Sequence, residues 1–312
     1  MPKVSFILPA YKRRFLHEAI ASILAQTYRD FELVVVDDRS PEGLKEVVDE
    51  FHDERLSYHC NEQNLGGKDL VAAWTHAMSF ARSEWCVLAS DDDVYLPGFL
   101  AEMIRLTEKY PQVDVVHARQ AMIDGNGKIL RIGQPRNEFE SQIEQAYNRD
   151  ILRLKQTAPE FMFRRTALEG IGGFVSTPKA WFTDNATWLA LAKNGICCSR
   201  DVLFYFRFSG MNITSKSNDV LDKVTAGEQH KEWFKKMVSA MVPANDIEAR
   251  MKELALEGID DAVDGVAKMY MSELPFKEWL DCYRKISTKQ PKKRGFLYER
   301  YPLLLGLRRL FK

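Results

Sequence analysis

Three consecutive aspartates, Asp91 to Asp93, directly follow the apolar run of residues 85–89. Carboxylates crowded in this way repel one another unless solvent or a cation compensates their charge. An apolar strand that ends in acids resembles the way in which α/β enzymes present ligands to a hard metal ion. The alternative is a solvated acidic turn before a helix that Pro97 opens. This segment alone leaves both interpretations open.

Two other polar segments also come directly after expected strands. Residues 9–11 (PAY) follow the apolar run 4–8, and residues 37–40 (DDRS) follow the β-branched run 31–36. In an open parallel sheet, ligands bind at the edge formed by the carboxyl ends of the strands. No glycine-rich phosphate loop follows the first strand, which disfavours an ordinary dinucleotide or P-loop site. A bound phosphate would therefore need a cation as counter-charge, and the acid cluster offers a place for one.

Strands and helices are expected to alternate to about residue 110, which predicts a parallel sheet covered by helices. The expected strands are 4–8, 31–36, 56–58 and 84–89, and the expected helices are 15–26, 69–81 and one that Pro41 opens. Residues 113–210 are expected to be mixed, with a hairpin turn at residues 124–127. Long helical patterns follow at 228–241 and 247–267. We therefore expect a first domain over residues 1–215 and a helical extension over residues 216–312.

The 312 residues have no net charge, but the charge is unevenly distributed. Residues 284–312 hold ten Lys or Arg and a single acid, Glu299, so this tail carries +9 and the rest of the chain −9. No stretch approaches the ~20 apolar residues of a membrane span, and no leader precedes the first strand. The five cysteines lack the spacing of a zinc site or a disulfide framework, which indicates reduced thiols in a cytoplasmic protein.

Six motifs follow one another in the order in which family 2 glycosyltransferases of GT-A fold carry them. The chain therefore resembles that family, and the resemblance covers residues 3–214. It implies a Rossmann-like, mostly parallel sheet flanked by helices. It also implies an inverting enzyme that moves a sugar from a nucleoside diphosphate to an acceptor hydroxyl with the help of Mg²⁺ or Mn²⁺. The motifs are residues 9–11 (PAY), 34–40 (VVVDDRS), 64–67 (NLGG), 91–93 (DDD), 163–174 (FRR to IGGF) and 183–189 (TD to WL).

The resemblance assigns the donor nucleotide to the first half of the chain. Tyr11 would stack on the base and Asp38 would accept a hydrogen bond from a base N–H, which favours uracil or thymine. The alternative for Asp38 is an N-cap of the helix that Pro41 opens. Lys68 would lie near the pyrophosphate as a point charge, or would be a solvated lysine at a helix start. The expected nucleotide-binding residues are Pro9, Ala10, Tyr11, Asp38, Asn64, Gly66, Lys68 and Asp91.

The family's metal motif is Asp-x-Asp-Asp with a proline four residues after the last acid. Pro97 aligns Asp92 and Asp93 with the paired acids, so Ser90 stands where the first acid is expected. The resemblance implies Asp92 as the principal metal ligand and Asp93 as a supporting ligand, while Asp91 would contact the ribose or the donor sugar. Diphosphate oxygens and water would complete the coordination of Mg²⁺.

Asp184 matches the acidic position four residues before Trp188 in the family's pattern, with Thr183 in place of the first acid. The resemblance implies that Asp184 is the general base, a role that contributes ~10²–10⁴-fold in rate. The alternative is that Asp184 caps a helix over residues 185–193. Such a cap is compatible with the catalytic role.

Three further residues are assigned to the acceptor side. Gly173 and Trp181 would shape the acceptor pocket, with ordinary packing as the alternative. Arg207 falls where relatives carry Tyr-Arg-x-His, and Ser209 replaces the histidine, so a metal or phosphate contact there is in doubt. Residues 211–214 would form a loop that closes over the donor.

The basic tail suggests contact with an anionic membrane surface. On a helical wheel, residues 303–312 place most leucines on one face and the basic side chains on the other. Each charge near the headgroups is worth about 1 kcal/mol, and membrane docking would suit an acceptor on a lipid carrier. The alternatives are packing on the body or on a second subunit of a homodimer. Nucleic-acid binding ranks last because the body is acidic and contains no known module for it.

The sequence thus predicts a metal-dependent inverting glycosyltransferase, with a UDP-sugar as the expected donor. It would act in cell-surface polysaccharide synthesis, in the cytoplasm or at the inner face of the membrane. One alternative is a non-catalytic sugar-nucleotide-binding protein, which Ser90 and Ser209 favour. The other is a sugar nucleotidyltransferase, which needs a loop rich in Gly, Lys and Arg after the first strand, and residues 12–14 (KRR) give this alternative some support.

Overall fold

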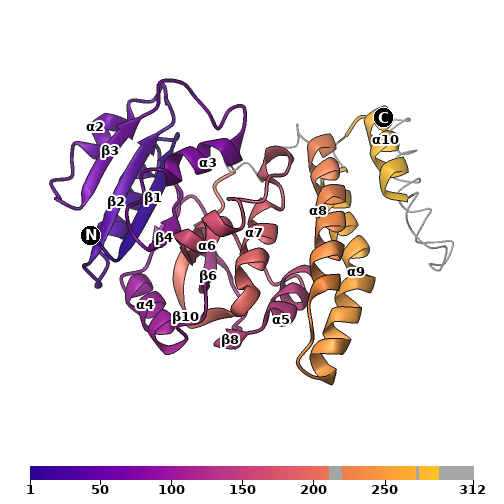
Figure 1. The fold of residues 1–312 in the computed structure, drawn as a ribbon. Helices are drawn as coiled ribbons and strands as arrows, with labels where there is room; N and C mark the ends of the chain where they lie inside the picture. The colour runs from indigo at the N-terminus through magenta and orange to yellow at the C-terminus, as the bar shows by residue number, and fades with distance from the viewer. Residues whose placement is uncertain (211–219, 272–273, 288–312) are drawn as a thin grey trace.

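The computed structural model describes residues 1–210, 220–271 and 274–287. The described residues form a ten-stranded sheet with helices packed on it (Figure 1). Across the sheet the order is β3 (Leu56–Cys60), β2 (Phe31–Asp37), β1 (Val4–Ala10), β4 (Trp85–Leu88), β9 (Phe161–Arg164), β6 (Val115–Ile123), β10 (Ile196–Arg207) and β5 (Val94–Tyr95). β7 (Ile129–Ile132) pairs with β6, and β8 (Phe139–Glu140) pairs with β10.

The first half of the sheet is parallel, as the alternating pattern predicts. β1 lies between β2 and β4 and pairs in parallel with both, while β2 pairs in parallel with β3. Successive β1 side chains enter two different cores: Phe6 packs with α1 (Leu16–Leu24), α2 (Leu44–Val48) and α4 (Phe99–Lys109), and Ile7 packs with α3 (Leu70–Met78). Both faces of the strand are therefore buried, which explains its continuous apolar sequence.

Two helix starts differ from the expectation, and a third agrees with it. Pro41 does not open α2, because the chain turns at Gly43 in the left-handed conformation (φ 68°) and the helix begins at Leu44. α7 (Thr183–Leu191) begins after Phe182, which is also left-handed (φ 64°), and not at residue 185. α3 agrees, because Asp69 caps its start by accepting from two backbone N–H groups.

The second half of the sheet is mixed. β9 lies antiparallel between β4 and β6, whereas β10 runs parallel to β6. The expected turn at residues 124–127 is confirmed, and it joins β6 to the antiparallel edge strand β7. Short helices cover this half: α5 (Gln142–Ala146), a π-helical turn Tyr147–Ile151, a 3₁₀ turn Ala158–Glu160, α6 (Arg165–Gly170), a 3₁₀ turn Pro178–Ala180, α7 and a 3₁₀ turn Ala192–Asn194.

The helical extension packs against α5 and α7 (Figure 1). It consists of α8 (Val220–Ala240), α9 (Asp246–Met271) and α10 (Phe276–Ser287), so both long helices that the sequence predicts are present. Phe234 and Ile259 of the extension share a core with Ile143 and Leu189 of the first domain. The division at residue 215 stays a prediction, and residues 211–214 and 288–312 lie outside the described residues.

No helix in the described part of the chain combines the length and the apolar character that crossing a membrane requires.

Candidate active site

The polar segments after β1, β2 and β4 meet at one edge of the sheet, as their positions at strand ends predict. The backbone N–H of Asp38 donates to the Ala10 carbonyl at 2.9 Å, and the Ser40 hydroxyl donates to the Tyr11 carbonyl at 2.7 Å. The backbone N–H of Tyr11 donates to an Asp91 carboxylate oxygen at 2.8 Å. The structure therefore joins the expected base pocket, Asp38 and the acid cluster into a single site.

The three aspartates are buried, with exposed fractions of 5, 2 and 1% for Asp91, Asp92 and Asp93. The interpretation as a solvated acidic turn is therefore wrong. Burial raises the pKa of the Asp91 carboxyl and raises that of Asp93 well above its usual range, and the neighbouring charge of Asp92 adds to both shifts. Such a cluster requires compensating donors or cations.

Lys12 supplies one of these compensating charges. Its ammonium lies 2.5 Å from an Asp92 oxygen and 3.0 Å from an Asp91 oxygen. Burial opposes the charged lysine, but the fields of Asp91 and Asp92 outweigh it and raise the Lys12 pKa. Lys12 therefore stays protonated against the acid cluster. In the sequence, residues 12–14 indicate only a short basic loop, and they do not predict that Lys12 pairs with the acid cluster.

Arg207 supports the acid cluster from inside the protein. Its backbone N–H donates to Asp93 at 2.8 Å, and its guanidinium donates to the Asp92 carbonyl at 2.8 Å and to Glu18 at 2.6 Å. The same guanidinium lies 4.3 Å from the centre of the Phe15 ring. Because the side chain is buried and holds these groups, Arg207 positions the acid loop, and its assignment to the acceptor side stays a prediction.

The acid cluster can offer a divalent metal few protein ligands. Among the described residues no group of three or more His, Cys, Asp or Glu side chains is arranged to hold a metal ion. Asp93 is enclosed behind the loop, whereas Asp92 directs one oxygen at Lys12 and accepts from the Ser90 hydroxyl with the other at 2.6 Å. This donor set fits an ion whose coordination is completed largely by diphosphate and water, provided that Lys12 withdraws.

Asp38 holds the loop of residues 61–67 and does not cap a helix. Its carboxylate accepts from the Asn61 amide at 2.8 Å and from the backbone N–H groups of Leu65 and Gly66 at 2.8 and 2.7 Å. The N-cap of α2 is Gly43, and no side chain caps it, so the capping interpretation is wrong. A carboxylate has about four lone-pair sites, so these bonds leave room for a contact to the base.

The glycines of this loop allow its close approach to Asp38 and Asn64. A Cβ on Gly66 would lie 3.0 Å from an Asp38 oxygen, and one on Gly67 would lie 2.2 Å from the Asn64 side-chain oxygen. That oxygen accepts from the Gly67 N–H at 2.6 Å, while the Asn64 amide donates to the Asp38 carbonyl at 3.0 Å. Lys68 is exposed just before the start of α3, as the helix-start interpretation expects, and its pyrophosphate contact stays a prediction.

Asp184 lies in the first turn of α7 and is partly exposed. It does not cap a helix over residues 185–193, because Phe182 occupies the N-cap position. Burial raises the pKa of the Asp184 carboxyl, while electrostatic interactions with Arg149 and His230 oppose that shift. A carboxyl group with a raised pKa is a stronger base when ionised, which suits proton abstraction.

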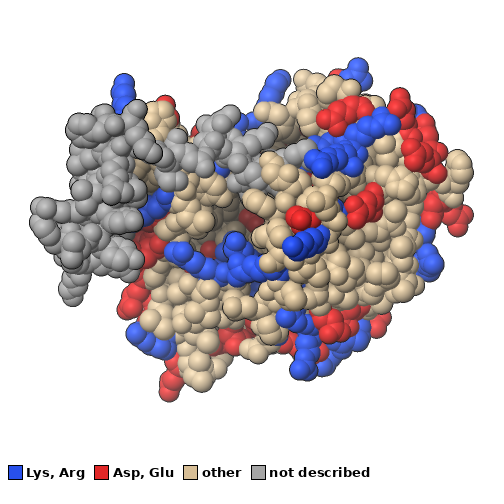
Figure 2. All heavy atoms as spheres, turned by 180° about the vertical axis from the view of Figure 1, so that it is seen from behind, with Lys and Arg blue, Asp and Glu red and all other residues tan. Residues whose placement is uncertain are grey.

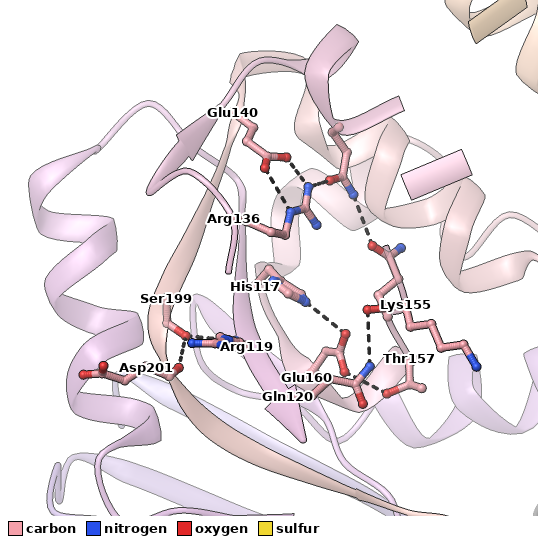
Figure 3. Close-up of polar contacts among 12 residues, drawn as sticks. His117, Arg119, Gln120, Arg136, Glu140, Lys155, Thr157, Glu160, Ser199 and Asp201 are labelled. Atoms are coloured by element: carbon pink, nitrogen blue, oxygen red, sulfur yellow. Dashed lines mark hydrogen bonds and ion pairs between the residues drawn. The ribbon is translucent and has the colours of Figure 1, made fainter. Parts of the chain in front are cut away.

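Glu160 connects Asp184 electrostatically with the acid cluster. Burial raises the Glu160 pKa well above its usual range, and the charges of Asp184 and Asp93 raise it further. Glu160 contacts His117 Nε2 at 3.0 Å and accepts from the Thr157 hydroxyl at 3.0 Å (Figure 3). Burial lowers the His117 pKa well below its usual value, so this pair is neutral. No sequence motif indicated Glu160, His117 or Arg149.

The other expected acceptor residues take part in packing. Gly173 (φ 94°) ends α6 by donating its N–H to the Leu168 carbonyl at 2.9 Å. The Trp181 ring packs edge-on against the Tyr270 ring of α9, with 5.2 Å between the ring centres. The Lys223 ammonium lies 4.5 Å from the centre of the Trp181 ring. Phe174, the last residue of the IGGF motif, is buried. The acceptor roles of Gly173 and Trp181 stay predictions.

Parts of this chain are similar in sequence to known glycosyltransferases. A glycosyltransferase of Methanocaldococcus jannaschii whose function is uncharacterised is 30% identical over 139 residues, which are 43% of this chain and 47% of that protein. A Campylobacter jejuni protein named GalNAc(5)-diNAcBac-PP-undecaprenol beta-1,3-glucosyltransferase is 29% identical over 178 residues, 54% of each chain. The chain thus spans about half the length of these relatives.

Solved structures share the fold at lower identity. S. aureus TarS 1–349 in complex with UDP-GlcNAc has a TM-score of 0.57 at 19% identity, over 92% of this chain and 90% of that one. The mannosyltransferase PcManGT from Pyrobaculum calidifontis, in complex with GDP-Man and Mn²⁺, has a TM-score of 0.57 at 17% identity, over 99% and 87%. The fold is the GT-A fold of these glycosyltransferases with a helical C-terminal region, as expected.

The family model described as Glycosyl transferase family 2 matches residues 5–172, from within β1 to the end of α6. The matched segment includes the base pocket, Asp38 and the acid cluster, whereas Asp184 follows it. The chain belongs to glycosyl transferase family 2.

Proposed function

We propose that this enzyme transfers a sugar from a nucleoside diphosphate to a hydroxyl group of a glycan acceptor, with inversion at the anomeric carbon and with a divalent metal ion. The observation that carries the proposal is the meeting of the buried acids from the β4 loop with the Tyr11 backbone and Asp38 at one edge of the sheet. On the other side, Asp184 and Asp93 both act electrostatically on Glu160. Donor binding and proton abstraction thus have separate residues within one site.

The donor half is assigned to uridine nucleotides. Tyr11, which is partly exposed at the site, would stack on the base, and Asp38 would accept from the imide N–H. The likeness to TarS, whose structures contain UDP and UDP-GlcNAc, agrees with this assignment. Asn64 and Gly66 shape the loop that holds Asp38, and Asp91 fixes the Tyr11 backbone, so these residues act on the donor by positioning.

The metal would be held by Asp92, with Asp93 supporting the loop from behind. Mg²⁺ or Mn²⁺ at this position would offset the charge that grows on the departing diphosphate. The mannosyltransferase from P. calidifontis contains Mn²⁺ beside a nucleotide sugar. Lys12 is the competing cation: it can swing from Asp92 to the diphosphate when the metal binds, because its side chain is partly exposed.

Asp184 would remove the proton of the acceptor hydroxyl as the bond to the anomeric carbon forms. The leaving diphosphate lies on the acid-cluster side, and the acceptor enters from the α7 side, so the hydroxyl attacks opposite to the leaving group. A single displacement of this kind inverts the configuration and needs no covalent intermediate. The proton passes to the Asp184 carboxylate, and the bond to the diphosphate breaks with its electron pair.

We assign the reaction to the assembly of a cell-surface polysaccharide at the inner face of the membrane. The C. jejuni relative, whose name contains a lipid-diphosphate acceptor, supports a carrier-bound glycan. The predicted contact of residues 284–312 with the membrane, or with a second subunit, rests on sequence alone, because residues 288–312 lie outside the described residues.

A transfer screen tests the proposal directly. The enzyme is incubated with Mn²⁺ and with UDP-, dTDP- or GDP-sugars, together with a panel of glycan and lipid-linked acceptors, and products are detected by mass spectrometry. We expect transfer from a UDP-sugar, and NMR of the product should show an inverted anomeric configuration. A product with retained configuration would refute the single displacement, and transfer from GDP-sugars alone would refute the base assignment of Asp38.

A further inference from the structure

A basic cleft lies between the β6–β7 hairpin and the segment of residues 152–155, outside the donor site. Its lining includes the cationic side chains of Arg119, Arg131, Arg136, Arg153 and Lys155, and it includes no Asp or Glu. On the face shown in Figure 2, Lys and Arg side chains gather along a hollow in the middle of the molecule. A concave surface lined by one sign of charge concentrates ligands of the opposite sign.

Three of the five cations are already used by the protein. Arg119 donates to the carbonyls of Gly133 and Arg200 at 2.8 and 3.0 Å. Arg136 pairs with the buried Glu140 (Figure 3). Arg153 donates to two backbone carbonyls in α9 at 3.2 and 3.3 Å. These side chains build the wall of the cleft.

The remaining two cations, Arg131 and Lys155, are available to a ligand. Neither side chain forms an ion pair or a hydrogen bond with any residue that the structure describes. In Figure 3 the Lys155 side chain extends away from the His117–Glu160 pair. Burial lowers the Lys155 pKa, and the positive charges of Arg131 and Arg149 lower it further. Like charges held this close are relieved when an anion binds between them.

Arg149 and Glu160 connect the cleft with α7, the helix that carries the candidate base. Arg149 acts electrostatically on both Lys155 and Asp184, and it donates to Asn185 of α7 at 2.8 Å. His117 lines the cleft and contacts Glu160, and the charge of Asp184 raises the pKa of Glu160. An anion bound at Arg131 and Lys155 would therefore belong to a molecule that can reach Asp184.

Apolar side chains are exposed beside the same cations. The edge strand β7 exposes Ile129, Leu130 and Ile132 by 47, 52 and 56%, and Leu152 of the cleft is 53% exposed. Arg131 pairs with the cleft residue Met122 and shares its face of the strand, whereas Ile132 pairs with Ala121 and lies on the opposite face, so Leu152 is the exposed aliphatic residue within the cleft itself. Aliphatic side chains on a solvent-exposed edge strand are a liability unless they meet a partner. The surface therefore combines an anion site with a hydrocarbon-binding edge.

We propose that Arg131 and Lys155 bind a phosphate of a lipid-linked acceptor, and that Leu152 contacts the hydrocarbon chain next to it, which continues over the exposed edge of β7. This inference rests on the proposed function, because it places the acceptor on the Asp184 side of the site. It goes beyond that function by naming the anion and the residues that select it. The combination of paired cations with exposed aliphatic residues favours this occupant over a free phosphate or a neutral glycan.

Ligand binding tests the inference without any transfer reaction. Dodecyl phosphate, uncharged dodecyl maltoside and inorganic phosphate are titrated into the full chain below their micelle-forming concentrations. UDP and Mn²⁺ are present at saturating concentrations so that the donor site is filled. Arg131→Ala and Lys155→Ala should each weaken dodecyl phosphate binding about tenfold. Lys128→Ala removes a cation from the same hairpin outside the cleft lining and should leave the affinity within about twofold.

The aliphatic part has its own variant. Leu152→Ser, at an exposed aliphatic residue of the cleft lining, should weaken the binding of dodecyl phosphate and leave that of inorganic phosphate unchanged. Equal affinity of the wild type and both cation variants for dodecyl phosphate would overturn the phosphate site. Binding of inorganic phosphate as tightly as dodecyl phosphate, or of dodecyl maltoside as tightly as either, would overturn the lipid-phosphate assignment. Because donor binding is measured separately, failure here is distinct from failure of the proposed function.

Discussion

The two halves of the site differ in how their charges are compensated. On the donor side, each buried aspartate is already held by a protein donor: Asp91 by the Tyr11 and Lys12 N–H groups, Asp92 by Ser90 and Lys12, and Asp93 by Arg207. On the acceptor side, Arg131 and Lys155 have no such partner among the described residues. The charges of the donor side are thus compensated by the protein before a ligand arrives, whereas the two cations of the proposed acceptor side are left for a ligand.

The largest expected effect separates chemistry from donor binding. Asp184→Asn removes the base and keeps the shape of the side chain, so we expect transfer to fall about 10²–10⁴-fold. Nucleotide affinity should change little, because the Asp184 side chain lies on the α7 side. Single-turnover transfer and calorimetric nucleotide binding measure the two quantities. Transfer within threefold of the wild type would remove Asp184 as the base.

The next effect concerns stability on the donor side. Arg207→Met removes the buried guanidinium that binds the Asp92 carbonyl and Glu18, and we expect unfolding in urea to require about 2 kcal/mol less free energy. The expected loss of stability is small because Glu18 is half exposed, so solvent weakens its ion pair with Arg207. Arg200→Met, a change at an exposed residue, is the matched control. Equal unfolding free energies for the two variants would contradict the positioning role of Arg207.

A smaller effect is expected from the donor loop. Gly67→Ala forces Asn64 aside and breaks the hydrogen bond between them, which costs about 1 kcal/mol and weakens nucleotide binding several-fold. Gly170→Ala is the control, because nothing lies within 4 Å of its added Cβ. If Gly67→Ala binds the nucleotide as tightly as the control does, the loop does not position Asp38.

The smallest effect is a shift of the pH profile. The base acts only when ionised, and burial raises the Asp184 pKa, so transfer should fall at a higher pH than for an ordinary carboxyl with a pKa near ~4. Arg149 and His230 oppose the shift and Glu160 faces the same region. Arg149→Met should move the acid limb of kcat/KM to higher pH, whereas the exposed Lys193→Met should not. If the acid limb of kcat/KM lies at the same pH in Arg149→Met as in the wild type, Arg149 does not lower the Asp184 pKa.

The donor half could largely be predicted from the sequence, because each of its motifs is local. An apolar strand followed at once by polar residues places those residues at the sheet edge, and this holds for residues 9–11, 37–40 and 91–93. The helix starts were less predictable. Gly43 and Phe182 adopt left-handed conformations, and Phe182 is held there by stacking on His230 of the extension at 4.8 Å. Contacts of this kind come from tertiary packing.

The acceptor half could not be predicted in the same way. Glu160 lies in a 3₁₀ turn and Arg149 in a π-helical turn, and neither element has a recognisable sequence pattern. Their meeting with Asp184 depends on the antiparallel insertion of β9 and on the packing of α8 and α9. Lys12 was visible in the sequence, but its pairing with Asp91 and Asp92 depends on the register of β1 against β4.

The central claim is that the acid cluster binds a nucleoside diphosphate together with a divalent metal. The most direct measurement is calorimetric titration of UDP, GDP and dTDP into the enzyme with Mn²⁺ or with a chelator, in the wild type, Asp92→Asn and Asp184→Asn. We predict that at least UDP binds only with Mn²⁺, that Asp92→Asn abolishes this binding, and that Asp184→Asn retains it. Equal binding in the chelator, or undiminished binding by Asp92→Asn, would contradict the account.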